Sequence, residues 1–418
     1  MHYLEKDDPE IAELILQESR RIETTLNLIA AESHAPPSVQ EALGSVFNEK
    51  TIEGYPGRRF HAGCIHADAV ETLAVSRAAS LFGAEYANIQ PHSGTSANLA
   101  VYFSLLDMGD RVLAMSLSHG GHLSHGHSAS ITSRCFEFAH YPVDMETERI
   151  DYDRVGQIAE TFRPRMIVTD ASSYPRLIDY QRMAEIAAGI GAYLMADMAH
   201  IAGLVAAEVI PSPVPHCDVV TFTCYKTLMG GRGGVVVARR DYGKRIDRTI
   251  FPGSQGTSPV NVIAAKAVTF KKAMAPEFRH IQSRTVANAG YLAAELEHRG
   301  FRIVTGGTDN HQVIVAVGIQ GLTGGLAERT LERVGIIANR NTIPADAASP
   351  PSVSGVRLGT CALTARGMGK GEMARVADVI HAALANPKDV PRLTEVASEV
   401  RRLCDKFPVN QKERMTNG

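Results

Sequence analysis

The chain has 418 residues, of which 44% are hydrophobic, enough for two or three domains with buried cores. Its formal net charge of −2, with acidic and basic residues interspersed, gives no overall attraction to nucleic acid or to an anionic membrane. The sequence shows no apolar stretch of membrane-spanning length, no signal-peptide core and no C-x-x-C pair among its six cysteines. We therefore expect a reduced, cytoplasmic, globular protein without a nucleic-acid or membrane partner.

Short apolar runs typical of buried strands alternate with helical patterns through the first 280 residues. One helical pattern, which includes Val70, Leu73 and Leu81, ends at Gly83, a natural residue to terminate a helix. The apolar runs predict strands at 86–90, 111–115, 165–170, 192–197, 219–223 and 233–239. This alternation predicts an α/β fold.

The pattern changes in the last third of the chain. The sequence predicts helices at 262–274 and 276–300, strands at 301–307 and 311–317, a helix near 326–335, a strand at 355–360 and a last helix at 372–385. This predicts a smaller α+β domain. We expect an N-terminal helical arm (1–45), a large domain (46–280) and a small C-terminal domain (281–418).

Polar residues follow several of the predicted strands, where open α/β sheets bind their ligands. Ser93, Gly94 and Thr95 open a helix whose free N–H groups favour a phosphate, although an ordinary helix cap is the alternative. Asp197 ends the strand at 192–197 and is either a helix cap or the partner of a protonated ring nitrogen. Lys226 follows the strand at 219–223 and is either a solvated surface charge or a Schiff-base lysine. The three features together are those that pyridoxal phosphate requires.

The histidine-rich segment "SHGGHLSHGHS" at 118–128 first suggests a metal site, because His119, His122, His125 and His127 have suitable spacings. The segment lacks the carboxylate of an H-E-x-x-H motif, and its glycines suit a loop better than a rigid chelate. We predict no metal here, and instead an imidazole that stacks on a flat cofactor ring.

Eight segments resemble, in order, those of serine hydroxymethyltransferases: "EGYPGRR", "QPHSG", "HGGHLSHG", "DMAHIAGLVAA", "RGGVVVA", "FPG", "GGTDNH" and "LGTCALTARG". The resemblance implies a fold-type I, aspartate aminotransferase-like architecture with a mostly parallel seven-stranded sheet. It implies pyridoxal 5'-phosphate as cofactor, tetrahydrofolate as co-substrate and an amino acid as substrate. It also implies a homodimer or dimer of dimers with shared active sites, in which the 51–61 loop and the segment around Gly256 reach across.

The same resemblance implies roles for individual residues. Those for the cofactor are Lys226 as the attachment point, Ser93, Gly94 and Thr95 at the phosphate, His122 stacked on the ring, Ser172 at the ring hydroxyl, Asp197 at the pyridine nitrogen, and His200, Thr223 and Gly256 as further contacts. Those for the substrates are Arg357 at the carboxylate, Glu53 as acid/base group, Thr51 and His61 in the amino-acid pocket, and Phe60, Leu117, Leu123 and Asn341 at the folate.

The chain departs from the family pattern near the substrate. Ala31 replaces a serine, Thr51, Phe60 and His61 stand at three tyrosine positions, and Tyr225 stands where a histidine normally precedes the lysine. The cofactor and folate positions are kept, which argues against unchanged serine specificity. The space left at Thr51 favours 2-methylserine and D-alanine as substrates.

Three alternatives remain at this stage. One is the ordinary serine/glycine reaction. Another is a folate-independent aldolase or L-threonine transaldolase, which the lost tyrosines favour and Glu53, Leu117, Leu123 and Asn341 oppose. The third is a non-catalytic homologue, which the retained Lys226 opposes.

Overall fold

A computed structural model of the protein describes residues 2–344, 346 and 353–409. The chain divides into two compact units. The large unit comprises 31–286 with 308–310, and the small unit comprises 1–30, 287–307 and 311–418. All six cysteines are free. No described helix combines the length and apolar character needed to cross a membrane.

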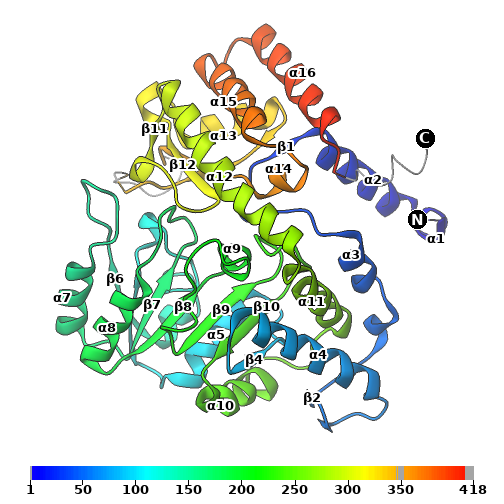
Figure 1. Ribbon diagram of the computed structural model, residues 1–418, viewed down its shortest axis with the longest axis vertical. Helices are drawn as coiled ribbons and strands as arrows, with labels where there is room; N and C mark the ends of the chain where they lie inside the picture. The colour runs from blue at the N-terminus through cyan, green and yellow to red at the C-terminus, as the bar shows by residue number, and fades with distance from the viewer. Residues whose placement is uncertain (1, 345, 347–352, 410–418) are drawn as a thin grey trace. The chain divides into compact units, whose positions relative to one another are not determined.

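A seven-stranded sheet forms the centre of the large unit (Figure 1). Its strands are β4 (Tyr86–Asn88), β5 (Arg111–Met115), β6 (Glu137–Tyr141), β7 (Met166–Asp170), β8 (Tyr193–Asp197), β9 (Val219–Thr223) and β10 (Gly234–Ala238), in the spatial order β4-β10-β9-β8-β7-β5-β6. Strand β10 runs in the direction opposite to the other six strands, which are parallel to one another. The predicted α/β fold with a mostly parallel sheet is confirmed. The sequence did not predict β6, whose residues "EFAHY" are partly exposed because the strand lies at the sheet edge.

Helices pack on both faces of this sheet. The helices of the large unit are α3 (Pro37–Leu43), α4 (Ile65–Phe82), α5 (Gly94–Leu105), α6 (Thr132–Cys135), α7 (Tyr152–Phe162), α8 (Tyr180–Ile190), α9 (Ala202–Ala206), α10 (Gly243–Arg248) and α11 (Val260–Ala273). Alternate strand residues enter two cores: Leu113 and Ile167 pack with α4, α8 and α11, whereas Val112 and Val168 pack with α5 and α10. Both faces are therefore buried, which explains the continuous apolar runs.

Two further features of the large unit agree with the local sequence. Helix α4 ends at Gly83, which adopts the left-handed conformation (φ 65°) that glycine takes most easily. A short hairpin, β2 (Gly54–Tyr55) and β3 (Arg58–Arg59), precedes α4. Helix α12 (Pro276–His298) starts in the large unit and continues in the small unit.

The small unit contains a four-stranded antiparallel sheet in the order β11-β12-β15-β14. The strands of that sheet are β11 (Arg302–Ile303), β12 (Gln312–Ala316), β14 (Asn339–Asn341) and β15 (Gly355–Gly359), and β1 (Leu26–Asn27) and β13 (Ile336–Ile337) form a separate two-stranded sheet. Its helices, besides the end of α12, are α1 (His2–Asp7), α2 (Pro9–Thr24), α13 (Gly324–Arg333), α14 (Cys361–Ala365), α15 (Lys370–Ala385) and α16 (Val390–Lys406). The sequence analysis ended with α15, so α16 was missed.

Single-turn elements complete the description: η1 (Val46–Glu49), η2 (Leu117–His119), η3 (Arg240–Tyr242), η4 (Thr249–Ser254), η5 (Val304–Gly306) and η6 (Gly318–Gln320).

Residues 1–30 cluster with the small unit, whereas the sequence suggested a separate arm of 1–45. Strand β1 pairs in parallel with β13, and α2 packs against α16. The buried Arg366 guanidinium donates to the backbone oxygens of Thr25 (2.8 Å), Glu23 (3.1 Å), Cys404 (3.0 Å) and Phe407 (2.6 Å). These bonds tie the end of α2 to the end of α16, so the two helices belong to one core.

Candidate active site

The structure brings the predicted cofactor residues of the large unit to one edge of its sheet. Asp197 is the last residue of β8, Ser172 follows β7, and Lys226 follows β9. All three are buried, with Asp197 and Lys226 each 6% exposed. The neighbouring strands β7, β8 and β9 are parallel, so their carboxyl ends meet. This is the edge at which open α/β sheets bind ligands.

Asp197 is surrounded by hydrogen-bond donors. Asn98 Nδ2 donates to its Oδ2 (2.7 Å), the backbone N–H of Ala199 donates to its Oδ1 (3.0 Å), and His125 Nε2 lies 3.3 Å from its Oδ2. The hydroxyl of Tyr102 lies 2.7 Å from His125 Nδ1. Burial raises the pKa of Asp197, but the hydrogen bond and charge of His125, the charge of His122 and the hydrogen bond of Asn98 together outweigh it and hold that pKa well below its usual range. A buried carboxylate that stays ionised fits a protonated pyridine nitrogen.

A second buried carboxyl group, Asp170, lies opposite Asp197 in the sheet register. Its Oδ1 accepts hydrogen bonds from the backbone N–H and the hydroxyl of Ser172, both at 2.9 Å. Burial raises the pKa of Asp170, and the charge of Asp197 raises it further. The negative charge of the pair therefore resides on Asp197. The sequence analysis missed Asp170, although it ends a strand run just as Asp197 does.

The predicted phosphate residues form the start of α5. Ser93 caps the helix, and its Oγ accepts from the backbone N–H of Ser96 (3.1 Å). A Cβ at Gly94 would lie 2.7 Å from Thr223 Cγ2, so this helix start approaches the end of β9 as closely as glycine allows. Asn98, on the next turn, accepts from the hydroxyl of Thr221 (2.6 Å) and donates to Asp197. The phosphate and ring residues therefore form one packed cluster, and the residues present fit pyridoxal phosphate.

The histidine segment contributes two of its four imidazoles to this cluster. The nearest ligand atoms of His122, His125 and Asp197 all lie within 4.8 Å of one another. His122 Nδ1 lies 2.7 Å from Ser124 Oγ. His119 instead accepts from the backbone N–H of Val143, and His127 from that of Ala129. His122 thus lies beside Asp197, the residue predicted to face the pyridine nitrogen.

Two other predicted contacts lie beside the lysine. The backbone oxygen of the buried His200 accepts from the hydroxyl of Thr227 (3.0 Å), and the hydroxyl of Thr223 donates to the oxygen of Ala199 (3.4 Å). Tyr225, which precedes the lysine, packs under the Arg232 guanidinium, 4.5 Å from its ring centroid. This cation–π contact gives the unusual tyrosine a structural partner.

The predicted amino-acid and folate residues of the large unit lie nearer the surface. The 51–61 loop is anchored by Arg59, whose buried side chain pairs with Asp68 and Glu71. Its remaining site candidates are half-buried (Glu53) or exposed (Thr51, Phe60 and His61). Gly256, Leu117 and Leu123 are also exposed. These residues therefore lie on a fixed loop or at the surface of the single chain, not among the buried ring residues.

Two predicted site residues belong to the small unit. Arg357 lies on β15, where its Nε donates to Asn339 Oδ1 (3.2 Å), and Asn341 lies on the adjacent strand β14, where its Nδ2 donates to the oxygen of Thr342 (2.6 Å). Ala31, which stands at the family's serine position, is half-buried at the start of the large unit.

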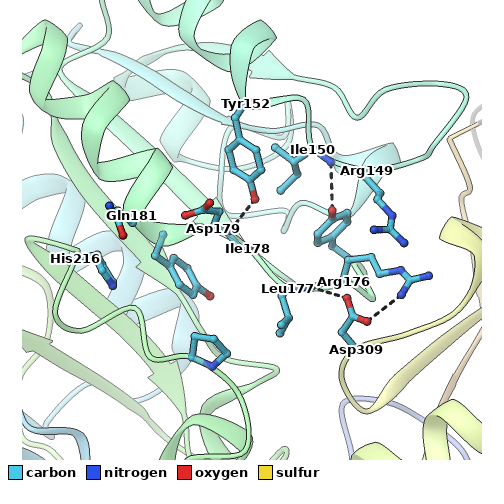
Figure 2. Close-up of a pocket in the computed structure, with 13 residues that line it drawn as sticks. Arg149, Ile150, Tyr152, Arg176, Leu177, Ile178, Asp179, Gln181, His216 and Asp309 are labelled. Carbon is cyan, nitrogen blue, oxygen red and sulfur yellow. Dashed lines mark hydrogen bonds and ion pairs between the residues drawn. The ribbon is translucent and has the colours of Figure 1, made fainter.

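A separate cavity of about 540 Å³ opens in the large unit (Figure 2). Tyr152, Tyr174 and Arg176 are among its lining residues, and Arg176 Nη1 lies 2.9 Å from Asp309 Oδ1. Figure 2 shows Tyr152 directed toward Asp179, whose backbone N–H donates to the tyrosine hydroxyl (2.7 Å). No predicted site residue lines this cavity, so it is distinct from the strand-end cluster.

The family model for serine hydroxymethyltransferase matches residues 4–380, which is nearly the whole chain. Members of that family are pyridoxal-phosphate-dependent enzymes of fold type I that transfer one-carbon units with tetrahydrofolate, and they usually form oligomers. The sheet, the lysine after β9 and the ionised aspartate at the end of β8 agree with this match. The chain therefore belongs to the serine hydroxymethyltransferase family and is a pyridoxal-phosphate-dependent hydroxymethyltransferase.

Proposed function

We propose that this enzyme acts on D-alanine and 2-methylserine in preference to glycine and serine. The reaction is 5,10-methylenetetrahydrofolate + D-alanine + H2O = tetrahydrofolate + 2-methylserine. The observation that carries the proposal is Thr51, a small side chain at a family tyrosine position on a loop that Arg59 anchors. Ala31 and His61 change the neighbouring positions, whereas the cofactor residues keep the family pattern.

The cofactor, when bound, supplies an electron sink for the carbanion at the substrate Cα. Lys226 attaches the cofactor, Asp197 holds the proton on the pyridine nitrogen, and His122 stacks on the ring. Ser172 binds the ring hydroxyl, and Ser93, Gly94 and Thr95 bind the phosphate, with further contacts from His200, Thr223 and Gly256. The burial and hydrogen bonding of the strand-end cluster support these assignments.

The remaining residues bind the two substrates. Arg357 binds the amino-acid carboxylate with the bidentate geometry that a guanidinium favours. Glu53 exchanges a proton at the transferred carbon, and Phe60, Leu117, Leu123 and Asn341 contact the folate. Phe60 is 76% exposed in the single chain, which supports a homodimer or dimer of dimers whose 51–61 loop and Gly256 segment complete the neighbouring subunit's site.

The stereochemistry explains why D-alanine is the substrate. In the family reaction, glycine loses the hydrogen that occupies the position of the hydroxymethyl group of L-serine, and keeps the other. Replacing that second hydrogen by a methyl group gives D-alanine. The same proton removal and the same carbon transfer then yield α-methyl-L-serine, provided that the pocket has room for the methyl. Thr51 provides that room, and L-alanine fails because its hydrogen lies on the wrong face.

The experiment compares kcat/KM for α-methyl-L-serine and L-serine, with tetrahydrofolate, in the native enzyme and in Thr51→Tyr. We expect the native enzyme to prefer α-methyl-L-serine and the tyrosine variant to lose that preference by about 10- to 100-fold, because one methyl group in a pocket is worth about 1–3 kcal/mol. A strong native preference for serine, or equal use of α-methylserine by the variant, contradicts the steric argument and leaves the ordinary serine/glycine reaction.

The lost tyrosines also support a second candidate, a folate-independent aldolase or L-threonine transaldolase. The same assay without tetrahydrofolate distinguishes it. Turnover that does not depend on folate identifies the aldolase-type reaction, whereas folate-dependent turnover identifies the hydroxymethyltransferase.

A further inference from the structure

A buried lysine lies beside the predicted phosphate turn and has no role in the function proposed above. Lys266 is in the middle of α11 and is 1% exposed. Its Nζ donates hydrogen bonds to the backbone oxygens of Ile89 (2.6 Å), Gly234 (2.9 Å) and Pro91 (3.1 Å). An ammonium group has three donors, so these three oxygens use its full capacity.

Two of these carbonyls belong to the segment that leads from β4 into the turn of Ser93–Thr95. The carbonyl between them, that of Gln90, accepts from the Ser258 hydroxyl (2.7 Å) and from Gln255 Nε2 (2.8 Å). The Pro91 oxygen also accepts from the backbone N–H of Gly234 (3.0 Å). Three consecutive carbonyls, at positions 89, 90 and 91, are therefore fixed by donors just before the chain enters α5.

The packing around Lys266 leaves no room for adjustment. A Cβ at Gly233 would lie 2.2 Å from Lys266 Cε, and a Cβ at Gly234 would lie 2.1 Å from the backbone oxygen of Ser93. The lysine side chain, the start of β10 and the first residue of the phosphate turn are therefore in direct contact. A displacement of one is transmitted to the others, because close-packed interiors do not absorb small shifts.

The charge of Lys266 is balanced by backbone oxygens, and among the described residues no carboxylate forms an ion pair with it. Burial lowers the pKa of Lys266 to about 8, and the neighbouring Cys224 and Glu71 partly oppose that effect. The three oxygens around its Nζ match the three N–H donors of an ammonium group. Glu71 also binds Gln90 Nε2 (2.8 Å), so the same segment is held from two sides.

We propose that Lys266 is a positioning residue for the cofactor phosphate. Its ammonium group fixes the backbone of residues 89–91 and thereby sets the first turn of α5 in the conformation in which Ser93, Gly94 and Thr95 bind the phosphate. The proposal rests on the family's cofactor and on the phosphate site assigned under the proposed function.

The experiment uses Lys266→Met in the full-length apoprotein, with Lys271→Met as the matched control, because Lys271 is an exposed lysine of the same helix. Dissociation constants are measured for pyridoxal phosphate and for pyridoxal, which keeps the aldehyde but lacks the phosphate. Hydrogen exchange is measured for the amides of residues 92–97. No amino acid or folate is present, so the result is independent of the substrate preference proposed above.

We expect Lys266→Met to raise the dissociation constant for pyridoxal phosphate at least about tenfold and that for pyridoxal less than about twofold. We also expect faster hydrogen exchange at the amides of residues 92–97, because three buried carbonyls lose a donor. Lys271→Met changes none of these. If Lys266→Met does not fold, Lys266→Gln is used, because it keeps two N–H donors without the charge. We expect Lys266→Gln to weaken the binding of pyridoxal phosphate more than that of pyridoxal, but by less than about tenfold.

Two results overturn the proposal. If Lys266→Met weakens the binding of both ligands equally, or leaves both affinities unchanged, Lys266 does not act through the phosphate turn. If the native protein binds pyridoxal as tightly as pyridoxal phosphate, the turn is not a phosphate site. Lys266 then cannot be a positioning residue for the phosphate.

Discussion

The charge of Asp197 is set by side chains from distant parts of the sequence. Asn98 comes from α5, whereas His122 and His125 come from the histidine segment. Burial raises the pKa of Asp197, and His125, His122 and Asn98 together reverse that effect. The carboxylate is thus available to the cofactor because its neighbours keep it charged.

Replacing His125 by Gln is expected to make the enzyme more sensitive to acid. The depressed pKa of Asp197 means that its favourable contribution is present above the ordinary aspartate pKa and is lost only when the pH falls through the depressed value. Without His125, the largest of the effects that oppose burial is lost and the pKa of Asp197 rises. The acidic limb of kcat/KM against pH is expected to move upward by about one unit or more.

His127→Gln is the control for that experiment, since His127 lies in the same segment and accepts from the backbone N–H of Ala129. An acidic limb that stays in place in His125→Gln contradicts the role given to His125.

Sequence patterns predicted the polar residues at the strand ends but not the residues that contact them. Lys226, Asp197 and Ser93 each follow a buried apolar run, and this position alone marks them. Asn98 acts through a hydrogen bond to Asp197 that only the folded chain creates, and nothing in its local sequence distinguishes it from another helix residue. Asp170 has the same strand-end position as Asp197, but only the folded chain shows that the two residues lie opposite each other in the sheet.

At the scale of elements, β10 differs from the rest of the sheet because it runs antiparallel. Its start, and not its end, therefore lies beside the phosphate turn, where Gly234 contacts Ser93 and Pro91. The apolar run at 233–239 correctly predicted a strand but not its direction. The only local indication of strand direction is the length of the turn that precedes it. The edge strand β6 was missed because its partly exposed residues form no continuous apolar run. Helix α16 was missed although its signal is present in the sequence, since Leu393, Val396, Val400 and Leu403 recur at helical spacing.

Gly234→Ala is expected to disrupt the phosphate turn. The added Cβ would lie 2.1 Å from the Ser93 backbone oxygen, so the start of β10 and the turn have to separate. We expect destabilisation by about 1–3 kcal/mol and weaker retention of pyridoxal phosphate, measured by thermal unfolding and by dialysis. Gly189→Ala in α8 serves as control because no atom lies within 4 Å of its Cβ position. The prediction is contradicted if Gly234→Ala and Gly189→Ala have equally small effects on thermal unfolding and on the retention of pyridoxal phosphate.

At the scale of the whole molecule, the first 30 residues join the core built by the end of the chain. Helical periodicity marked an N-terminal segment, but no sequence pattern indicates which core a segment joins. Arg366 supplies the physical link, because it bonds backbone oxygens at the end of α2 and at the end of α16. A single side chain thus stabilises an association between the two ends of the chain.

Arg366→Ala is expected to destabilise the small unit by at least about 3 kcal/mol, because buried carbonyls that lose their donor each cost about 1–3 kcal/mol. Urea unfolding of the full-length protein measures the effect. The control is Arg375→Ala in α15, an exposed arginine whose ion pair with Glu399 is 4.0 Å long and is worth little. If the two variants have similar urea concentrations at the midpoint of unfolding, Arg366 does not stabilise the small unit as described.

The hairpin connection between β9 and β10 also limits how the chain length can vary. Residues 227–233 join Lys226 to the strand start that contacts the phosphate turn, and Gly230 N–H donates to the Cys224 oxygen (2.8 Å) while its Cβ position lies 2.3 Å from Thr269 Oγ1. An inserted or deleted residue here displaces the lysine and the phosphate turn together. Relatives that use this cofactor geometry are therefore expected to keep the length of this connection even where its residues differ.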